Sequence, residues 1–343
     1  MDFLDRLKAG VLIIAEAGVN HNGDVELAKR LVDVAADARA DAVKFQTFQA
    51  DRLASASTPK ARYQLHTTSS VESQLEMLQR LELSPGAHRA LCEYCRKRDV
   101  IFMSTPFDEE SADLLEELGV PVFKIASGEI TNLPFLEWIA RKGKPIILST
   151  GMSYLSEVDE AVRVIRDAGC DQFALLHCVS SYPAEPADAN LRAVQTLAAA
   201  FQVPIGYSDH TLGIEMPLAA VALGARVIEK HLTLDRSLTG PDHRMSLSPA
   251  EFAAMVRAIR KVEIALGDGR KRPVPAEEDV RRAARRSLVA ACDIPAGARI
   301  ERQMVTAKRP GTGLAPGLTE QVVGRVAKRH IASQEAFDWE VLG

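Results

Sequence analysis

Two histidines, His210 and His231, each follow a short apolar run of the sequence. Imidazoles that meet with open positions and nearby carboxylates suit a divalent transition metal such as Mn²⁺. A lone histidine of this kind is more often hydrogen-bonded than metal-bound, so the pairing carries the prediction. We expect water and substrate to complete the metal shell, because only these two protein ligands are evident.

Two lysines, Lys44 and Lys124, lie in or at the end of other apolar runs. A lone lysine at such a point could equally form a surface ion pair. Two ammonium groups together with hydroxyl donors indicate a pocket for a phosphate and a carboxylate. The predicted hydroxyl donors are Thr105, Ser127, Ser149 and Ser208.

Four carboxylates are candidates for moving protons or accepting hydrogen bonds from substrate hydroxyls. Any one of them could instead simply balance a lysine charge. The four are Glu16, Glu129, Glu229 and Asp242.

The elements that position these residues are indicated by a regular alternation of apolar runs and Ala/Leu/Glu/Arg-rich stretches. Continuous apolar runs are typical of parallel strands that are buried on both faces. Eight strand–helix units in about 270 residues predict an α/β protein with a (β/α)₈ TIM barrel. A doubly wound sheet is the alternative, without a Gly-x-Gly-x-x-Gly fingerprint to support it. The expected strands are 11–15, 42–47, 100–104, 121–125, 145–149, 172–177, 203–207 and 225–230.

In such a barrel the active site forms at the carboxyl ends of the strands. Polar residues lie in or after the end of every one of the eight runs, including Gln46 in the second and Tyr182 beyond the sixth. A purely structural barrel would not need polar groups at so many converging points. The sequence therefore predicts an enzyme whose site lies at this end.

The composition changes after the last predicted helix. We expect the barrel over residues 1–270, a linker over 271–286, and a small β-rich domain over 287–343. The linker is rich in arginine, but interleaved acidic residues and the lack of aromatics argue against nucleic-acid binding.

The overall composition is that of a soluble globular protein, with 47% hydrophobic and 26% charged residues and a net charge of −4. This charge favours neither nucleic acid nor an anionic membrane. The apolar run Val11–Ala15 is too short for a signal-peptide core or a membrane span. We expect a cytoplasmic protein, and an odd count of five cysteines does not indicate a disulfide framework.

Several motifs together resemble the sialic acid synthase family, which includes N-acetylneuraminate, legionaminate and pseudaminate synthases. The tail from Ser287 resembles the antifreeze-like, or SAF, domain of that family. Thr239, where the family often has proline, and Arg285 or Arg286, close to where some members have an aromatic residue, depart from the pattern. The matching segments are Ile13–Asp24, Val43–Thr47, Ser104–Phe107, Phe123–Glu129, Leu148–Met152, Gly206–Thr211, Ile228–Thr233, Gly240–His243 and Lys308–Gly313.

The resemblance implies a barrel with a SAF domain in a domain-swapped homodimer, in which each SAF domain covers the partner's barrel. It implies Mn²⁺, or Mg²⁺ or Co²⁺, on the histidine pair, and phosphoenolpyruvate on the lysines and hydroxyls named above. Glu16 matches a glutamate near the attacking water. The residues that match sugar contacts are Gln46, Glu129, Tyr182, Asp242 and Arg309.

The implied reaction condenses phosphoenolpyruvate with an open-chain N-acetylated amino sugar and water, giving a nonulosonic acid and phosphate. The sequence leaves the sugar open among N-acetylmannosamine, its 6-phosphate and a 6-deoxy diacetamido hexose, the acceptor of legionaminate or pseudaminate synthases. The rival hypotheses are a Schiff-base pyruvate aldolase, a barrel metal hydrolase, and a non-enzymatic carbohydrate- or ice-binding protein.

Overall fold

A computed structural model describes residues 3–69 and 71–343 of the chain. The chain divides into two compact units, of which the first ends at Gly267 and the second comprises Asp268–Gly343. The segment predicted as a linker groups with the second unit.

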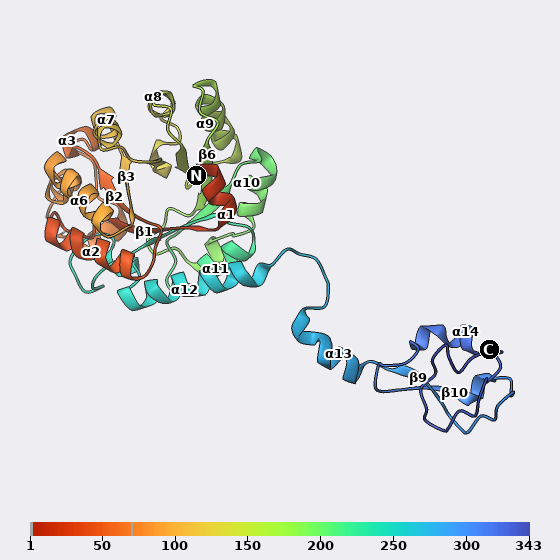
Figure 1. The fold of residues 1–343 in the computed structure, drawn as a ribbon. Helices are drawn as coiled ribbons and strands as arrows, with labels where there is room; N and C mark the ends of the chain where they lie inside the picture. The colour runs from red at the N-terminus through yellow and green to blue at the C-terminus, as the bar shows by residue number, and fades with distance from the viewer. Residues whose placement is uncertain (1–2, 70) are drawn as a thin grey trace. The chain divides into compact units, whose positions relative to one another are not determined.

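Eight parallel strands form the centre of the first unit, in the order β3-β2-β1-β8-β7-β6-β5-β4. The two end strands of this order pack side by side, so the sheet is a nearly closed barrel (Figure 1). This confirms the predicted TIM-barrel fold class. The strands are β1 (Leu12–Gly18), β2 (Ala42–Thr47), β3 (Ile101–Pro106), β4 (Phe123–Ile125), β5 (Ile146–Ser149), β6 (Phe173–Cys178), β7 (Ile205–Asp209) and β8 (Val227–His231).

Helices surround the barrel and connect its strands (Figure 1). Their starts follow local capping chemistry; for example, the Asp24 carboxylate accepts the Glu26 backbone N–H at 2.7 Å. No helix in the described part of the chain is long and apolar enough to span a membrane. The helices that follow the strands are α2 (Val25–Asp37), α6 (Pro85–Lys97), α7 (Glu109–Glu117), α8 (Leu133–Arg141), α9 (Leu155–Asp167), α10 (Ala193–Phe201), α11 (Glu215–Ala222) and α12 (Pro249–Leu266).

Four shorter helices of the first unit were not expected from the sequence. One precedes the first strand, and three interrupt the long connection between β2 and α6. They are α1 (Phe3–Ala9), α3 (Ala50–Leu53), α4 (Arg62–Thr67) and α5 (Gln74–Leu81).

The strands separate two layers of apolar packing. Ile13 belongs to the large cluster between the strands and the outer helices, whereas Ile14 belongs to a smaller cluster inside the barrel. Successive strand residues point to opposite faces of a sheet. Residues in phase with Ile14 therefore face the barrel interior, and near the carboxyl ends these residues become polar.

The second unit has its own apolar core, which includes Leu288, Ile294 and Phe337. An antiparallel pair, β9 (Ser287–Ala290) and β10 (Val305–Lys308), forms its small sheet. It also contains two short α-helices, α13 (Glu278–Ala284) and α14 (Thr319–Val322). The β-rich small domain predicted in the fold class is thus present.

Candidate active site

Polar side chains from all eight strand ends gather around one cavity of about 240 Å³ at the carboxyl end of the barrel. Twelve residues singled out in the sequence line it. They are Glu16, Lys44, Gln46, Thr105, Lys124, Ser127, Ser149, Tyr182, Ser208, His210, Glu229 and His231.

Strand register explains why these side chains converge. Glu16 pairs with Lys44 on β2 and with His231 on β8 in the parallel ladders. Glu16 lies two residues after the inward-facing Ile14, and Glu229 lies two residues after Val227 of the same inner cluster. The period of two carries both carboxylates into the barrel mouth.

The ammonium group of Lys44 lies at the centre of a buried charge cluster. Its Nζ is 2.7 Å from Glu16 Oε2 and 3.7 Å from Glu229 Oε2, and it donates to Thr105 Oγ1 at 3.0 Å. The Lys44 residue is 4% exposed, so these contacts replace water almost completely.

Lys124 repeats this arrangement on the other side of Glu229. Its Nζ donates to Ser149 Oγ at 2.8 Å and lies 3.5 Å from Glu229 Oε1. Ser208 donates to the same Glu229 oxygen at 2.9 Å. Two cations and their hydroxyl partners therefore share one cavity, as an anion-binding pocket requires.

The two buried carboxylates have opposite protonation behaviour. Burial raises the pKa of Glu16 to about 7, although the nearby Lys44 acts against it. Burial would also raise the pKa of Glu229, but Lys124 and Lys44 outweigh it and lower that pKa. Glu16 can thus exchange a proton near neutral pH while Glu229 stays ionised, which is how environment assigns two carboxylates to different roles.

The two lysines also differ. Burial alone would lower the pKa of Lys44, but the Glu16 and Glu229 carboxylates raise it. Burial lowers the pKa of Lys124, assisted by the like charge of Lys44 and only partly offset by Glu229. Lys44 is therefore the more firmly charged of the pair.

The two histidines lie side by side at the rim. The rings of His210 and His231 are 5.5 Å apart between centroids. His210 Nδ1 is 2.7 Å from the carbonyl oxygen of Val179, which fixes Nδ1 as the protonated nitrogen and leaves Nε2 with a free lone pair. Burial lowers the pKa of both imidazoles, that of His231 strongly, so both are neutral at pH 7.

These donors fit a divalent metal. Within residues 3–69 and 71–343, His231 Nδ1 is buried without a hydrogen-bond partner, and Asp242 Oδ2 lies 3.8 Å from it. The same residues contain no cluster of three His, Cys, Asp or Glu side chains that would form a complete protein shell. An open site of two neutral imidazoles with a nearby carboxylate remains, and it leaves positions for water or substrate oxygens.

Three of the predicted residues are not among those that line this cavity. Asp242 is buried beside His231. Glu129 lies in the short helix after β4 and accepts a hydrogen bond from Asn132 Nδ2 at 2.8 Å. Arg309 is in the second unit, where its Nε donates to the carbonyl of Ala284 at 2.9 Å.

Sequence reasoning missed Cys178, which lines the cavity and lies 3.1 Å from the Ser127 hydroxyl. Its position at the end of β6, two residues after the inward-facing Leu176, is the signal that could have identified it. The same alternation turns Asp209 and Lys230 away from the site, where they form a fully buried ion pair with each other.

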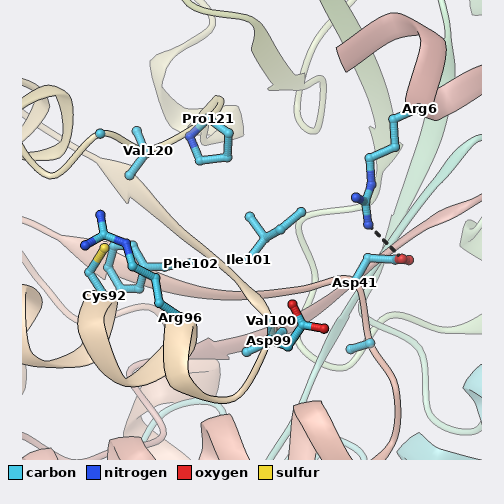
Figure 2. Close-up of a pocket in the computed structure, with 12 residues that line it drawn as sticks. Arg6, Asp41, Cys92, Arg96, Asp99, Val100, Ile101, Phe102, Val120 and Pro121 are labelled. Carbon is cyan, nitrogen blue, oxygen red and sulfur yellow. Dashed lines mark hydrogen bonds and ion pairs between the residues drawn. The ribbon is translucent and has the colours of Figure 1, made fainter. Parts of the chain in front are cut away.

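A larger cavity of about 540 Å³ lies beside the amino ends of β2 and β3, opposite the predicted residues. Figure 2 shows Arg6 and Asp41 pointing toward each other on one side of it. The Asp41 carboxylate forms ion pairs with Arg6 at 2.9 Å and with Arg260 at 2.6 Å, so two arginines balance its charge. Among the described residues, the lining of this cavity includes neither lysines nor histidines, and we do not regard it as the active site.

Comparison with known proteins gives one consistent result. The model of the NeuB family matches residues 31–271, and that of the SAF domain matches residues 285–342.

Two similar proteins are named N,N'-diacetyllegionaminic acid synthase. The one from Campylobacter jejuni is 50% identical over 94% of this chain and 98% of its own. The one from Legionella pneumophila is 48% identical over 96% and 93%.

A solved structure is similar as well. The N-acetylneuraminic acid (sialic acid) synthetase from Leptospira borgpetersenii is 41% identical and has a TM-score of 0.71, covering 79% of this chain and 90% of that one.

Proposed function

The chain belongs to the NeuB family, and we propose that it condenses phosphoenolpyruvate with the open-chain form of an N-acetylated amino sugar. The products are a nonulosonic acid and inorganic phosphate. The family membership expected from the motifs is confirmed, and the chain is an enzyme of the transferase type. The main structural support is the single cavity that contains two buried lysines beside two neutral histidines.

The lysine pair is proposed to hold the phosphate and carboxylate of phosphoenolpyruvate. Lys44 and Lys124 already point their ammonium groups into the cavity, held by Thr105 and Ser149. They need little rearrangement when an anion arrives, and preorganised charge of this kind stabilises developing negative charge.

The proposed reaction proceeds in three steps. The methylene carbon of phosphoenolpyruvate bonds to the aldehyde carbon, and water adds at the carbon that bears the phosphate. Glu16, whose pKa of about 7 suits proton exchange at neutral pH, orients this water and accepts its proton. The C–O bond to phosphate then breaks as the hydroxyl group on the same carbon gives its proton to the departing phosphate, leaving the keto group of the product. The proton taken up by Glu16 passes to the alkoxide formed from the aldehyde oxygen, which becomes a hydroxyl group.

We propose that His210, through Nε2, and His231 hold a divalent metal, with Mn²⁺ as the usual ion and Mg²⁺ or Co²⁺ as substitutes. When bound, such an ion supplies Lewis-acid polarisation of the aldehyde oxygen. Support comes from the His210 tautomer and from the unpartnered His231 nitrogen.

We further propose that the enzyme is a cytoplasmic homodimer in which the SAF domain of one subunit covers the barrel of the other. Three apolar side chains after β5 support a covering partner: Met152 is 72%, Tyr154 81% and Leu155 47% exposed. Arg309 of the partner subunit would then reach the N-acetyl group of the acceptor.

Subunit complementation tests this assembly. Lys124→Met and Arg309→Ala proteins should each lack turnover, because each site in either homodimer has one defective part. Mixing and re-equilibrating them should restore activity, since one site of each mixed dimer combines an intact barrel with an intact SAF domain. No recovery in mixed dimers verified by mass spectrometry would refute the swapped arrangement.

The decisive experiment for the reaction is phosphate release from phosphoenolpyruvate with bridging ¹⁸O. Wild-type protein with Mn²⁺ and each of the three amino sugars should release phosphate with at least one of them. The ¹⁸O label should appear in phosphate, because the C–O bond breaks. No release with any of the sugars would refute the proposal, and label retained in the sugar product would refute the bond-breaking step.

A Schiff-base aldolase is the second candidate, and one observation favours it. Burial lowers the pKa of Lys124, a shift that activates amine nucleophiles. Borohydride with pyruvate would trap an adduct on such an enzyme, and activity would survive chelation. We expect neither result.

A further inference from the structure

A buried ion pair lies directly behind the two histidines, on the outer face of the barrel strands. Asp209 and Lys230 are partners in the parallel ladder between β7 and β8, and both side chains are fully buried. Asp209 lies two residues after Tyr207, and Lys230 lies two residues after Ile228. Tyr207 and Ile228 both belong to the large apolar cluster outside the strands. The pair therefore places two charges at the end of an apolar face.

Burial gives this pair little advantage in stability. Both charges lose their hydration, so a buried ion pair is often no more stabilising than apolar side chains of similar size. The bonds that apolar side chains cannot make are therefore the feature of the pair that needs an explanation.

Both members of the pair bind the backbone of Thr211. The Asp209 Oδ1 atom accepts the Thr211 backbone N–H at 2.9 Å and the Thr211 hydroxyl at 2.9 Å. Lys230 Nζ donates to the Thr211 carbonyl and contacts Asp209 Oδ2. Since Asp209 and Thr211 flank His210, these bonds fix the backbone on both sides of that histidine.

Further bonds hold His210 itself. Its carbonyl accepts the Ala184 backbone N–H at 2.9 Å, and its Nδ1 lies 2.7 Å from the Val179 carbonyl. These bonds fix the backbone and one ring nitrogen without using Nε2, the nitrogen that is left for a ligand. Bonds of this kind orient metal-binding histidines and set their tautomer.

The same ion pair reaches the second histidine along the chain. Lys230 directly precedes His231, whose carbonyl accepts the Leu247 backbone N–H at 2.8 Å. Asp209 directly precedes His210 in the same way. The contact between Asp209 and Lys230 therefore joins the two backbone positions that carry the imidazoles, whose ring centroids lie 5.5 Å apart.

We infer that Asp209 and Lys230 are positioning residues, which hold His210 and His231 at the spacing and orientation that bind a divalent cation. Neither is among the described residues that line the active-site cavity, so both act from behind the strands. The inference rests on the proposed function and adds two residues on which its metal site depends.

The test measures the Kd of Mn²⁺ in protein stripped of metal and then freed of chelator, by electron paramagnetic resonance of the free ion. Lys230→Met removes the bond to the Thr211 carbonyl. We expect its Kd to be about 10–100-fold higher, the range for losing a group that orients a metal ligand. The KM for phosphoenolpyruvate at saturating Mn²⁺ should stay near its wild-type value, because Lys44 and Lys124 keep their hydroxyl partners.

A double variant separates positioning from stability. Lys230→Met alone leaves the Asp209 carboxylate buried without its cation, which destabilises the fold. Asp209→Asn combined with Lys230→Met removes both charges, so it should recover stability in urea while its Kd for Mn²⁺ stays raised. Recovery of Mn²⁺ affinity together with stability would overturn the inference. If Lys230→Met does not fold, judged by circular dichroism, the double variant and Asp209→Asn alone still decide the question, since both should bind Mn²⁺ more weakly than wild type.

Asp41 provides the matched control at the amino end of the barrel. Its carboxylate also accepts a strand backbone N–H, that of Ile13 at 2.8 Å, and pairs with Arg260 at 2.6 Å. Asp41→Asn should therefore lower stability and leave the Kd of Mn²⁺ unchanged. An equal loss of Mn²⁺ affinity in Asp41→Asn would show a general effect of stability and refute the positioning role.

Comparison with His231→Ala separates the possible failures. Wild-type protein that binds no more Mn²⁺ than His231→Ala would refute the proposed metal site and the inference with it. If wild-type protein binds Mn²⁺ through His231, an unchanged Kd in Lys230→Met and in the double variant would refute the inference alone.

Discussion

Replacing Lys44 with methionine removes a buried ammonium group while keeping the length of the apolar stem. The substitution leaves Glu16 and Glu229 with Lys124 as the remaining cation of the cluster. Breaking a buried ion pair from one side costs about 3–5 kcal/mol, because the other charge loses its partner. Glu16 can escape part of this cost by binding a proton, since its pKa is about 7 even with Lys44 in place. We therefore expect a loss of about 3 kcal/mol at pH 7.

The sign of the pH dependence follows from the same residue. Without Lys44, the pKa of Glu16 rises further above the ordinary value of 4.5 in the folded protein. Between the ordinary value of 4.5 and this raised pKa, which lies above the wild-type value of about 7, the folded state holds a proton that the unfolded chain releases, so stability falls as pH rises through that range. The limiting slope is about 1.4 kcal/mol per pH unit for one proton. Glu16→Gln in the same protein should remove this slope and recover about 2 kcal/mol, within the range expected for coupled neighbours.

Urea denaturation with a chelator present measures these effects without a bound metal. The chain has two tryptophans, Trp138 on α8 and Trp339 in the second unit, so a Trp339→Phe background makes fluorescence report the barrel. Lys124→Met is the matched control, because it removes an ionic partner of Glu229 rather than of Glu16. Glu16→Gln should therefore not restore the stability of Lys124→Met. Equal stability of Lys44→Met and wild type, or additive losses in the double variant, would refute the reasoning.

Three further predictions concern the metal, the second unit and a buried histidine. His210→Ala and His231→Ala should each lose both bound Mn²⁺, measured by elemental mass spectrometry, and activity; a metal-stripped His231→Ala protein with near-normal turnover would count against the metal site. A chain cut before Ser287 should keep the barrel's circular dichroism and lose turnover, whereas full activity would contradict the role given to Arg309. Burial lowers the pKa of His21 from 6.5 to about 4, so the unfolded chain binds more protons between these values. Barrel stability should therefore fall by about 3 kcal/mol as pH drops through this window, and His21→Gln should flatten that dependence in denaturation series at several pH values.

The fold could be predicted because most of the buried strands are largely apolar runs that become polar toward their carboxyl ends. The expected segment 42–47 coincides with β2, and α12 ends at Leu266, shortly before the predicted end of the barrel at residue 270. The helix α4 was missed because the connection around it lacks helical periodicity. Its position depends on tertiary contacts such as Lys60 with Glu72.

The sequence could predict which residues line the site, but not how their pKa values shift. Polar residues at the predicted strand ends identified most of the groups that line the cavity. The two-residue alternation of a strand separates Glu229, which faces the cavity, from Lys230, which faces away from it. The opposite pKa shifts of Glu16 and Glu229 depend on distances of 2.7 to 3.7 Å to two lysines. Sequence spacing cannot provide such distances, because they arise from the closure of the barrel.

The charge cluster also explains how two lysines stay in a buried cavity before an anion arrives. Isolated ammonium groups in this environment would lose their protons, as the lowered pKa of Lys124 already indicates. Glu16 and Glu229 supply negative charge in place of substrate and keep Lys44 charged. An entering anion then adds negative charge next to Glu16, whose pKa of about 7 lies at neutrality. The residue that must exchange a proton with water is therefore the residue whose protonation responds most directly to the arrival of the anion.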